Sequence, residues 1–170
     1  MRVNNLKELE AELKKRIQNA LVNEVNDVVQ DVMQDHIISD VYDVYDPVMY
    51  TRRMNNGGLL DRNNIVSDLK GDLRLSVKNV TLGDKYYMLR EYSKSGGYTA
   101  KPMISQNYNK PIAEVIETGQ GYDVKGWEYY GVPRPFMRNT YEDLRDNHCI
   151  TTAMKNGLKR QGIKIRNDNE

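Results

Sequence analysis

The side chains that could carry out nucleophilic catalysis are few in this chain. The 170 residues include two histidines, His36 and His148, and a single cysteine, Cys149. A cysteine nucleophile needs a base within hydrogen-bond reach. His148 and Cys149 are adjacent, and neighbouring side chains on a helix point about 100° apart, so they do not form a dyad. The chain is therefore interpreted as non-enzymatic, and a hydrolase that uses His148 and Cys149 is the least favoured alternative.

Ligand-binding patterns are also incomplete. Asp40, Asp43 and Asp46 recur every third residue, but the central glycine and terminal glutamate of a calcium-binding EF-hand loop are missing. The glycine-containing segments match neither of the common phosphate-binding loops, GxGxxG and GxxxxGK[ST]. We therefore expect no metal and no cofactor, and we interpret the three aspartates as a solvated acidic edge.

Basic side chains suggest contacts with anionic groups. Arg52 and Arg53 are adjacent and come shortly after Tyr50, and a guanidinium group binds phosphate or carboxylate with two parallel hydrogen bonds. The pair could hold such a ligand or form a salt bridge with another subunit. The C-terminal residues 155–166 are basic but too sparse for a nucleic-acid motif. Direct, non-specific contact with DNA stays open.

Charge and hydropathy limit the class of protein. Lys plus Arg total 25 and Asp plus Glu total 24, so the formal net charge of +1 exerts no overall attraction on nucleic acid or an anionic membrane. No run approaches the roughly 20 apolar residues of a membrane span. One cysteine allows no intramolecular disulfide, and the N-terminus does not resemble a signal peptide. We expect synthesis in the cytoplasm and no membrane partner.

A long amphipathic helix is predicted for residues 1–38. Its apolar positions from Leu6 to Ile37 are spaced by three and four. Asn4 or Asn5 can cap it, with Glu8 completing a capping box. Such a helix spans on the order of 50 Å, which exceeds a compact domain of this size. Its apolar stripe packs either entirely on the chain's own sheet or partly on a neighbouring subunit, and the sequence does not choose between them.

The remaining elements predict an α+β fold in a single domain, residues 1–170. Strands are expected within residues 59–92, and in one of them Leu73, Leu75 and Val77 should face the core. Residues 93–133 are expected to be irregular loops, and residues 134–170 a C-terminal helix and basic tail. The two helices should pack on a small, mainly antiparallel sheet with long loops.

Three short motifs carry a resemblance to a known family. A Tyr-x-Pro-x-x-Tyr-x-Arg segment precedes the strands, a Glu-x-Gly element follows them, and an Arg-Pro-Phe element begins the last helix. They are formed by Tyr45, Pro47, Tyr50 and Arg52, then by Glu117 and Gly119, and finally by Arg134, Pro135 and Phe136. In this order, from Leu6 to Leu158, the chain is similar to the small neck and tail-component family of long-tailed bacteriophages. The segment Ser93 to Pro111 is longer than in simpler members.

That resemblance implies a structural virion protein that is made in the host cytoplasm and located in the neck or tail region. It implies a homo-oligomeric ring around the DNA channel that contacts adjacent neck, connector or tail proteins. The loops are rich in tyrosine, which suits protein contact surfaces. The candidate interface residues are Tyr45, Pro47, Tyr50, Arg52, Arg53, Tyr98, Tyr108, Glu117, Tyr122, Trp127, Tyr129, Tyr130, Arg134 and Phe136. The alternative is a nucleic-acid-binding phage or prophage regulatory protein.

Overall fold

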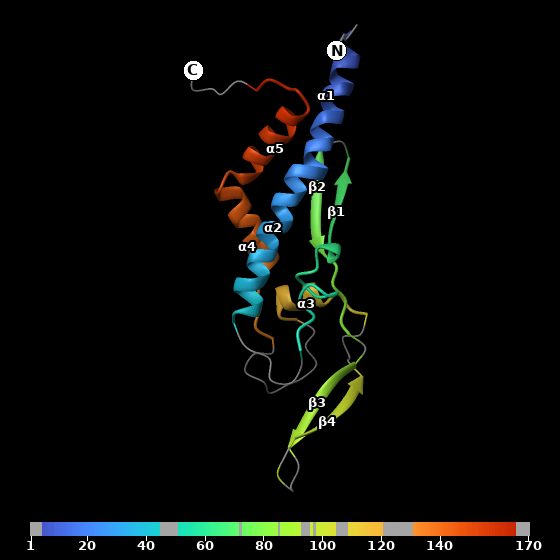
Figure 1. Ribbon diagram of the computed structural model, residues 1–170, viewed down its shortest axis with the longest axis vertical. Helices are drawn as coiled ribbons and strands as arrows, with labels where there is room; N and C mark the ends of the chain where they lie inside the picture. Colours follow the sequence, from blue (N-terminus) through green and yellow to red (C-terminus); the bar gives the residue numbers. More distant parts are fainter. Residues whose placement is uncertain are drawn as a thin grey trace. The chain divides into compact units, whose positions relative to one another are not determined.

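The computed structural model confirms an α+β fold with a long N-terminal helix and further helices at the C-terminal end (Figure 1). It describes residues 5–44, 51–71, 73–84, 86–92, 96, 98–104, 109–120 and 131–165. Contacts divide the chain into two compact units. Unit 1 comprises Met1–Met33, Ser67–Lys78 and Thr140–Glu170, and unit 2 comprises Gln34–Val66 and Asn79–Asn139.

The predicted long helix is continuous and extends four residues beyond Ile38. It consists of α1 (Leu6–Ala20), a π-helical segment η1 (Leu21–Val25), α2 (Asn26–His36) and a second π-helical segment η2 (Ile37–Tyr42). The predicted capping box is present at Asn5: the backbone N–H of Glu8 donates to Asn5 Oδ1 at 2.9 Å, and Asn5 Nδ2 donates to Glu8 Oε1 at 3.1 Å.

The π-helical segments have a physical reason in the spacing of the buried side chains. These recur at every fourth position: Leu21, Val25, Val29, Met33, Ile37 and Val41. In an α-helix of 3.6 residues per turn, each step of four residues rotates the side chain by about 40°. A π-turn, with i→i+5 hydrogen bonds, holds more residues and reduces that rotation. Segments η1 and η2 therefore help to keep the six side chains in line.

The first hairpin consists of β1 (Ile65–Lys70) and β2 (Arg74–Asn79), which run in opposite directions in Figure 1. The predicted inward direction is confirmed for Leu75 and Val77, which pack on the core of unit 1. It is wrong for Leu73, whose side chain is mostly exposed. The strand begins at Ile65 because turns and a 3-10 helix, η3 (Arg62–Asn64), take up the residues before it.

The second hairpin corrects the expectation of irregular loops over residues 93–133. β3 (Tyr86–Tyr92) pairs antiparallel with β4 (Tyr98–Ile104), so that Tyr92 lies opposite Tyr98. A two-stranded sheet consists of edge strands, which tolerate a proline such as Pro102. The short helix α3 (Ile112–Thr118) also lies in this range. Neither β4 nor α3 has a strong periodicity of its own, so pairing and packing decide both.

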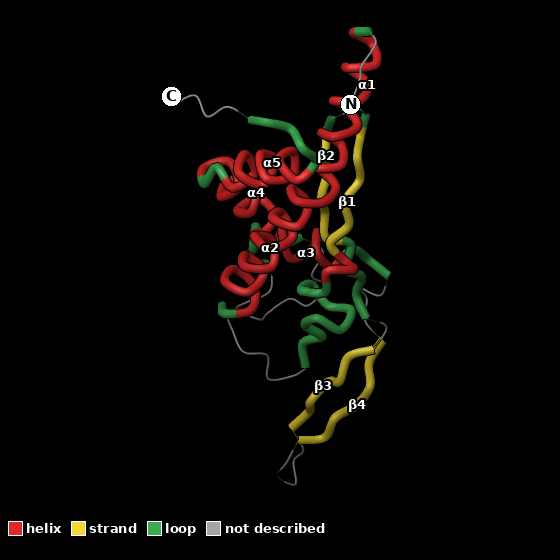
Figure 2. The backbone as a smooth tube through the Cα atoms, turned by 45° about the horizontal axis from the view of Figure 1, so that its top comes forward, coloured by secondary structure: helices red, strands yellow, loops and turns green. Residues whose placement is uncertain are grey.

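The C-terminal helix is divided in two, which corrects the prediction of one helix. α4 (Phe136–Asp146) ends before His148, whose φ of 52° is left-handed, and α5 (Cys149–Arg160) starts after it (Figure 2). In unit 1, α5 lies closely against α1 and η1. A Cβ added at Gly157 would lie 2.8 Å from Ala20 Cβ and 2.6 Å from Glu24 Oε2, so only glycine permits this approach.

Each unit has buried apolar side chains of its own. In unit 1, η1 and α2 contribute Leu21, Val25 and Val29, which cluster with Leu144 and Ala153. In unit 2, Ile37, Ile65 and Phe136 are fully buried. The buried side chains of Asn79 and Thr81 donate to the backbone carbonyls of Leu59 and Gly58, at 2.8 and 3.2 Å. Within the described ranges, none of the helices combines the length and apolar character required to cross a membrane.

Candidate functional site

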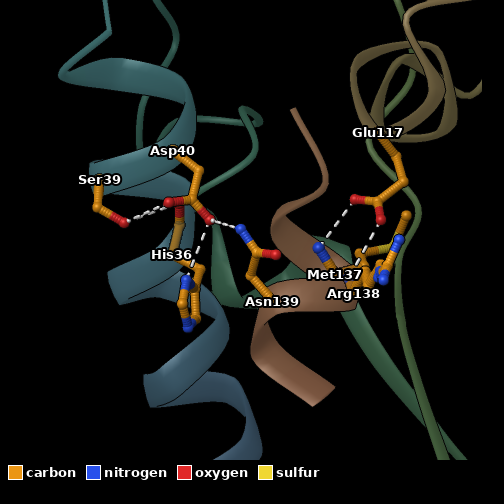
Figure 3. Close-up of polar contacts among 7 residues, drawn as sticks. All are labelled: His36, Ser39, Asp40, Glu117, Met137, Arg138 and Asn139. Atoms are coloured by element: carbon orange, nitrogen blue, oxygen red, sulfur yellow. Dashed lines mark hydrogen bonds and ion pairs between the residues drawn. The ribbon is translucent and has the colours of Figure 1, made fainter. Parts of the chain in front are cut away.

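The first turn of α4 is held by a carboxylate from another helix (Figure 3). Glu117, in α3, accepts hydrogen bonds from the backbone N–H groups of Met137 and Arg138 at 2.8 and 3.1 Å. N–H groups in the first turn of a helix have no partner within that helix. A negative charge there is also favoured by the helix dipole. Glu117 therefore acts as an N-terminal cap supplied from about twenty residues earlier in the chain.

The chain around Glu117 is packed tightly enough to require a glycine. Gly119 ends α3 with φ of 67°, and its N–H donates to the Val115 carbonyl at 2.9 Å. A Cβ at Gly119 would lie 2.5 Å from the Gly131 carbonyl oxygen. The backbone N–H of Arg134 donates to the Ile116 carbonyl at 2.9 Å. The Glu-x-Gly and Arg-Pro-Phe elements singled out in the sequence thus form one junction inside unit 2.

Two predicted interface residues lie buried at this junction. Phe136 is fully buried and Arg134 nearly so. Their positions, with the cap supplied by Glu117, show that the Arg-Pro-Phe element stabilises the fold of this unit. The sequence resemblance identified the residues, but their pairing across the chain was not visible in it.

Asp40 joins the other side of the same turn of α4 to the long helix. Its Oδ2 accepts from Asn139 Nδ2 at 2.9 Å and lies 3.0 Å from His36 Nδ1, while its Oδ1 accepts from Ser39 Oγ at 2.9 Å (Figure 3). Burial alone would raise the pKa of Asp40, but the hydrogen bonds from Asn139, Ser39 and His36 outweigh it and hold that pKa below its usual value. The expectation of a solvated acidic edge is therefore wrong for Asp40, although Asp43 is exposed.

The two arginines considered for anion binding have partners within the chain. Arg52 Nη1 donates to the Tyr42 carbonyl at 2.7 Å, and its guanidinium carbon lies 4.7 Å from the centroid of the Tyr42 ring. Arg53 Nη2 donates to the Leu82 carbonyl at 2.6 Å and Nη1 lies 3.0 Å from Asp84 Oδ1. Burial raises the pKa of Tyr42. Both guanidinium groups thus stabilise unit 2.

The apolar stripe of the long helix is covered over only part of its length. Leu6, Leu9 and Leu13 are 81%, 49% and 45% exposed, whereas Ala20 is fully buried. Between them, Ile17 is half-buried and packs on the core of unit 1. The sequence predicted the stripe and the need to cover it, and the structure locates its uncovered part at the start of α1.

Most of the other candidate interface residues lie outside the described part of the chain. Tyr98 begins β4. Seven further aromatic residues and one proline lie outside the described residues: Tyr45, Pro47, Tyr50, Tyr108, Tyr122, Trp127, Tyr129 and Tyr130. His148 is exposed, whereas Cys149 is half-buried on the core of unit 1. In the part of the chain that the structure describes, no group of three or more His, Cys, Asp or Glu side chains is placed to hold a metal ion.

Comparison with known proteins places the chain in a family. Residues 5–160 match the family described as YomN. The chain is 38% identical over 133 residues to the "SPbeta prophage-derived uncharacterized protein YomN" of Bacillus subtilis (strain 168), covering 76% of this chain and 73% of the relative. No solved structure matches. This relationship associates the chain with prophages. The chain belongs to the YomN family.

Proposed function

We propose that the chain is a structural virion protein of the phage neck, a tail-completion or head-tail connector component that assembles as a ring joining tail to head. It acts without catalysis and without a cofactor. The observation that carries the proposal is the uncovered leucine stripe of α1, where Leu6, Leu9 and Leu13 continue a face that is buried further along the helix. In a ring, one surface of each subunit covers a different surface of the next.

The free energy gained by burying the leucine stripe indicates how strongly it could hold two subunits together. Fully burying a leucine contributes about 1.5–3 kcal/mol, so three partly exposed leucines contribute on the order of 3–5 kcal/mol. Association costs about 4–15 kcal/mol in lost freedom of movement. The stripe by itself is therefore too weak for a stable dimer. Further contacts between neighbouring subunits would add what the purified protein needs to self-associate, and contacts with adjacent neck, connector or tail proteins would stabilise the ring further.

Two further considerations support the proposal. The relative carries the description "SPbeta prophage-derived", and the order of short motifs resembles the neck and tail-component family. In this proposal the protein is made in the host cytoplasm and resides in the virion neck. A nucleic-acid-binding regulator is the rival, and it would act on a specific duplex without entering the particle.

Electron microscopy of particles produced without the gene tests the role in assembly. We expect heads and tails that are unjoined, or tails of abnormal length, because the joining ring would be missing. Virions of normal appearance would show that the protein has another role.

Sedimentation velocity of the purified protein tests whether the leucine stripe mediates self-association. The substitutions Leu9→Gln and Leu13→Gln together should abolish self-association while leaving the circular dichroism spectrum unchanged. Ile38 and Val44 are matched controls, since they are 41% and 50% exposed outside the stripe. The double variant Ile38→Gln, Val44→Gln should assemble as the wild type does. Equal loss in both double variants would contradict a specific role for the stripe.

A further inference from the structure

Two basic segments from opposite ends of the sequence lie together in unit 1. One is Lys14, Lys15 and Arg16 in α1, and the other comprises Lys155, Lys159 and Arg160 in α5 with Lys164 just beyond it. Figures 1 and 2 both show α5 beside the long helix. Gln161 joins the two segments, because its Nε2 donates to the Arg16 carbonyl at 3.0 Å and its own carbonyl accepts from Arg16 Nη1. We call the two segments together the basic end of unit 1.

The basic end carries an excess of positive charge. No Asp or Glu occurs in residues 13–23 or in residues 147–165. Glu12 pairs with Arg16 at 2.8 Å and Glu24 pairs with Arg160 at 3.2 Å, which neutralises part of the charge. Lys15, Lys155, Lys159 and Lys164 are exposed. The net charge of +1 for the whole chain conceals this excess, because most of the acidic residues lie elsewhere in the sequence.

The chemistry of the exposed side chains distinguishes between possible partners. In these two segments, the exposed residues are Lys, Arg, Asn and Gly. A protein interface usually needs aromatic or apolar side chains at its centre. Contact with phosphates needs none, because affinity comes from basic groups that displace condensed counterions.

We propose that the basic end of unit 1 binds the phosphate backbone of duplex DNA without sequence preference. The basic end adjoins the leucine stripe, which stops at Leu13, but it is assigned to a different partner, so the proposal goes beyond ring assembly. The C-terminal segment alone has too few basic residues for a nucleic-acid motif. The structure adds the three basic residues of α1 to it.

Fluorescence anisotropy with the full chain and a labelled duplex of arbitrary sequence tests the proposal. Binding should weaken steeply as salt rises from about 50 to 200 mM, with a slope of log K against log salt of about −0.9 per phosphate contact. The triple variant Lys15→Gln, Lys159→Gln, Lys164→Gln should flatten that slope by up to about 2.7 and lower the affinity at least about tenfold at low salt.

A triple variant with the same change in net charge is the control. Lys7, Lys78 and Lys110 are exposed outside the basic end. The variant Lys7→Gln, Lys78→Gln, Lys110→Gln should bind DNA almost as the wild type does. Equal losses in the two variants, or no binding by the wild type at low salt, would overturn the proposal. So would a strong dependence on duplex sequence, or capture of polyglutamate in preference to DNA, which would indicate an acidic protein partner. None of these outcomes depends on whether the protein joins heads to tails.

Discussion

At the scale of single residues, Glu117 has the most clearly defined task. Its carboxylate oxygens accept from two backbone N–H groups at the start of α4. Glu117→Gln keeps the shape but removes the negative charge, so the free energy of unfolding should fall by about 1 kcal/mol in urea denaturation. Glu114→Gln is the control, because Glu114 is exposed on the same helix. An equal loss for Glu114→Gln would show that the capping contact is not responsible.

Asp40 makes stability depend on pH in the acid range. Its folded pKa lies below the usual value of 3.8, so its contribution is complete above that value and is lost as the pH falls through the folded pKa. Asp40→Asn should lower the free energy of unfolding by on the order of 1 kcal/mol at neutral pH, allowing for solvent screening.

The pH dependence separates charge from packing in this variant. The difference between the wild type and Asp40→Asn should shrink as the pH falls below 3.8 and through the folded pKa, because the carboxylate takes up a proton. Asp43→Asn, at an exposed position of the same helical end, should show no such trend. A difference that stayed constant over this range would mean that shape, not charge, holds the contact with Asn139.

At the scale of elements, the turns that end helices and strands differ in whether they have room for a side chain in place of glycine. Gly119 and Gly71 both have positive φ, 67° and 63°. A Cβ at Gly71 would meet nothing within 4 Å, whereas one at Gly119 would overlap the Gly131 carbonyl. Gly71→Ala should cost about 1–2 kcal/mol of unfolding free energy through backbone strain alone. Gly119→Ala should cost at least about 3 kcal/mol, because the steric overlap adds to that strain. Thermal and urea unfolding of the two variants measures the difference, and equal costs would contradict the tight junction between α3 and α4.

The long helix shows how a simple spacing in the sequence leads to an unusual backbone. A strict period of four from Leu21 to Val41 does not match the α-helical period of 3.6. The structure resolves this mismatch with η1 and η2. The sequence predicted a helix here, because a period of four is close to 3.6. It did not show that the backbone would widen to match the spacing.

At the scale of the whole molecule, the start of α1 is separable from folding. The described residues 5–10 are all exposed. Removing residues 1–10 should therefore change the melting temperature by no more than about 2 °C. The same truncation should weaken self-association, since it removes Leu6 and Leu9. Differential scanning fluorimetry and sedimentation velocity check the two halves of this prediction. A large fall in the melting temperature would show that the stripe stabilises the fold of the subunit, which would contradict a role in assembly alone.

The sequence by itself determined the features that depend on neighbouring residues. The cap at Asn5 and Glu8, the helix that follows, the strand containing Leu75 and Val77, and the helical character of the residues after Phe136 were all predicted. In each case the signal is a local spacing of three, four or two residues. The order of the short motifs also indicated a phage protein, and the prophage origin of the relative agrees with that.

Only the tertiary structure decided which distant residues meet. No local pattern indicated that Glu117 would cap α4, that Asp40 would bind Asn139, or that Gln161 would hold Arg16. The sequence-based prediction also missed β4, which depends on pairing with β3, and the break at His148 between α4 and α5. Local spacing fixes the backbone of one segment at a time. The hydrogen bonds and burial that join segments depend on groups far apart in the chain, so they arise only once those segments have packed.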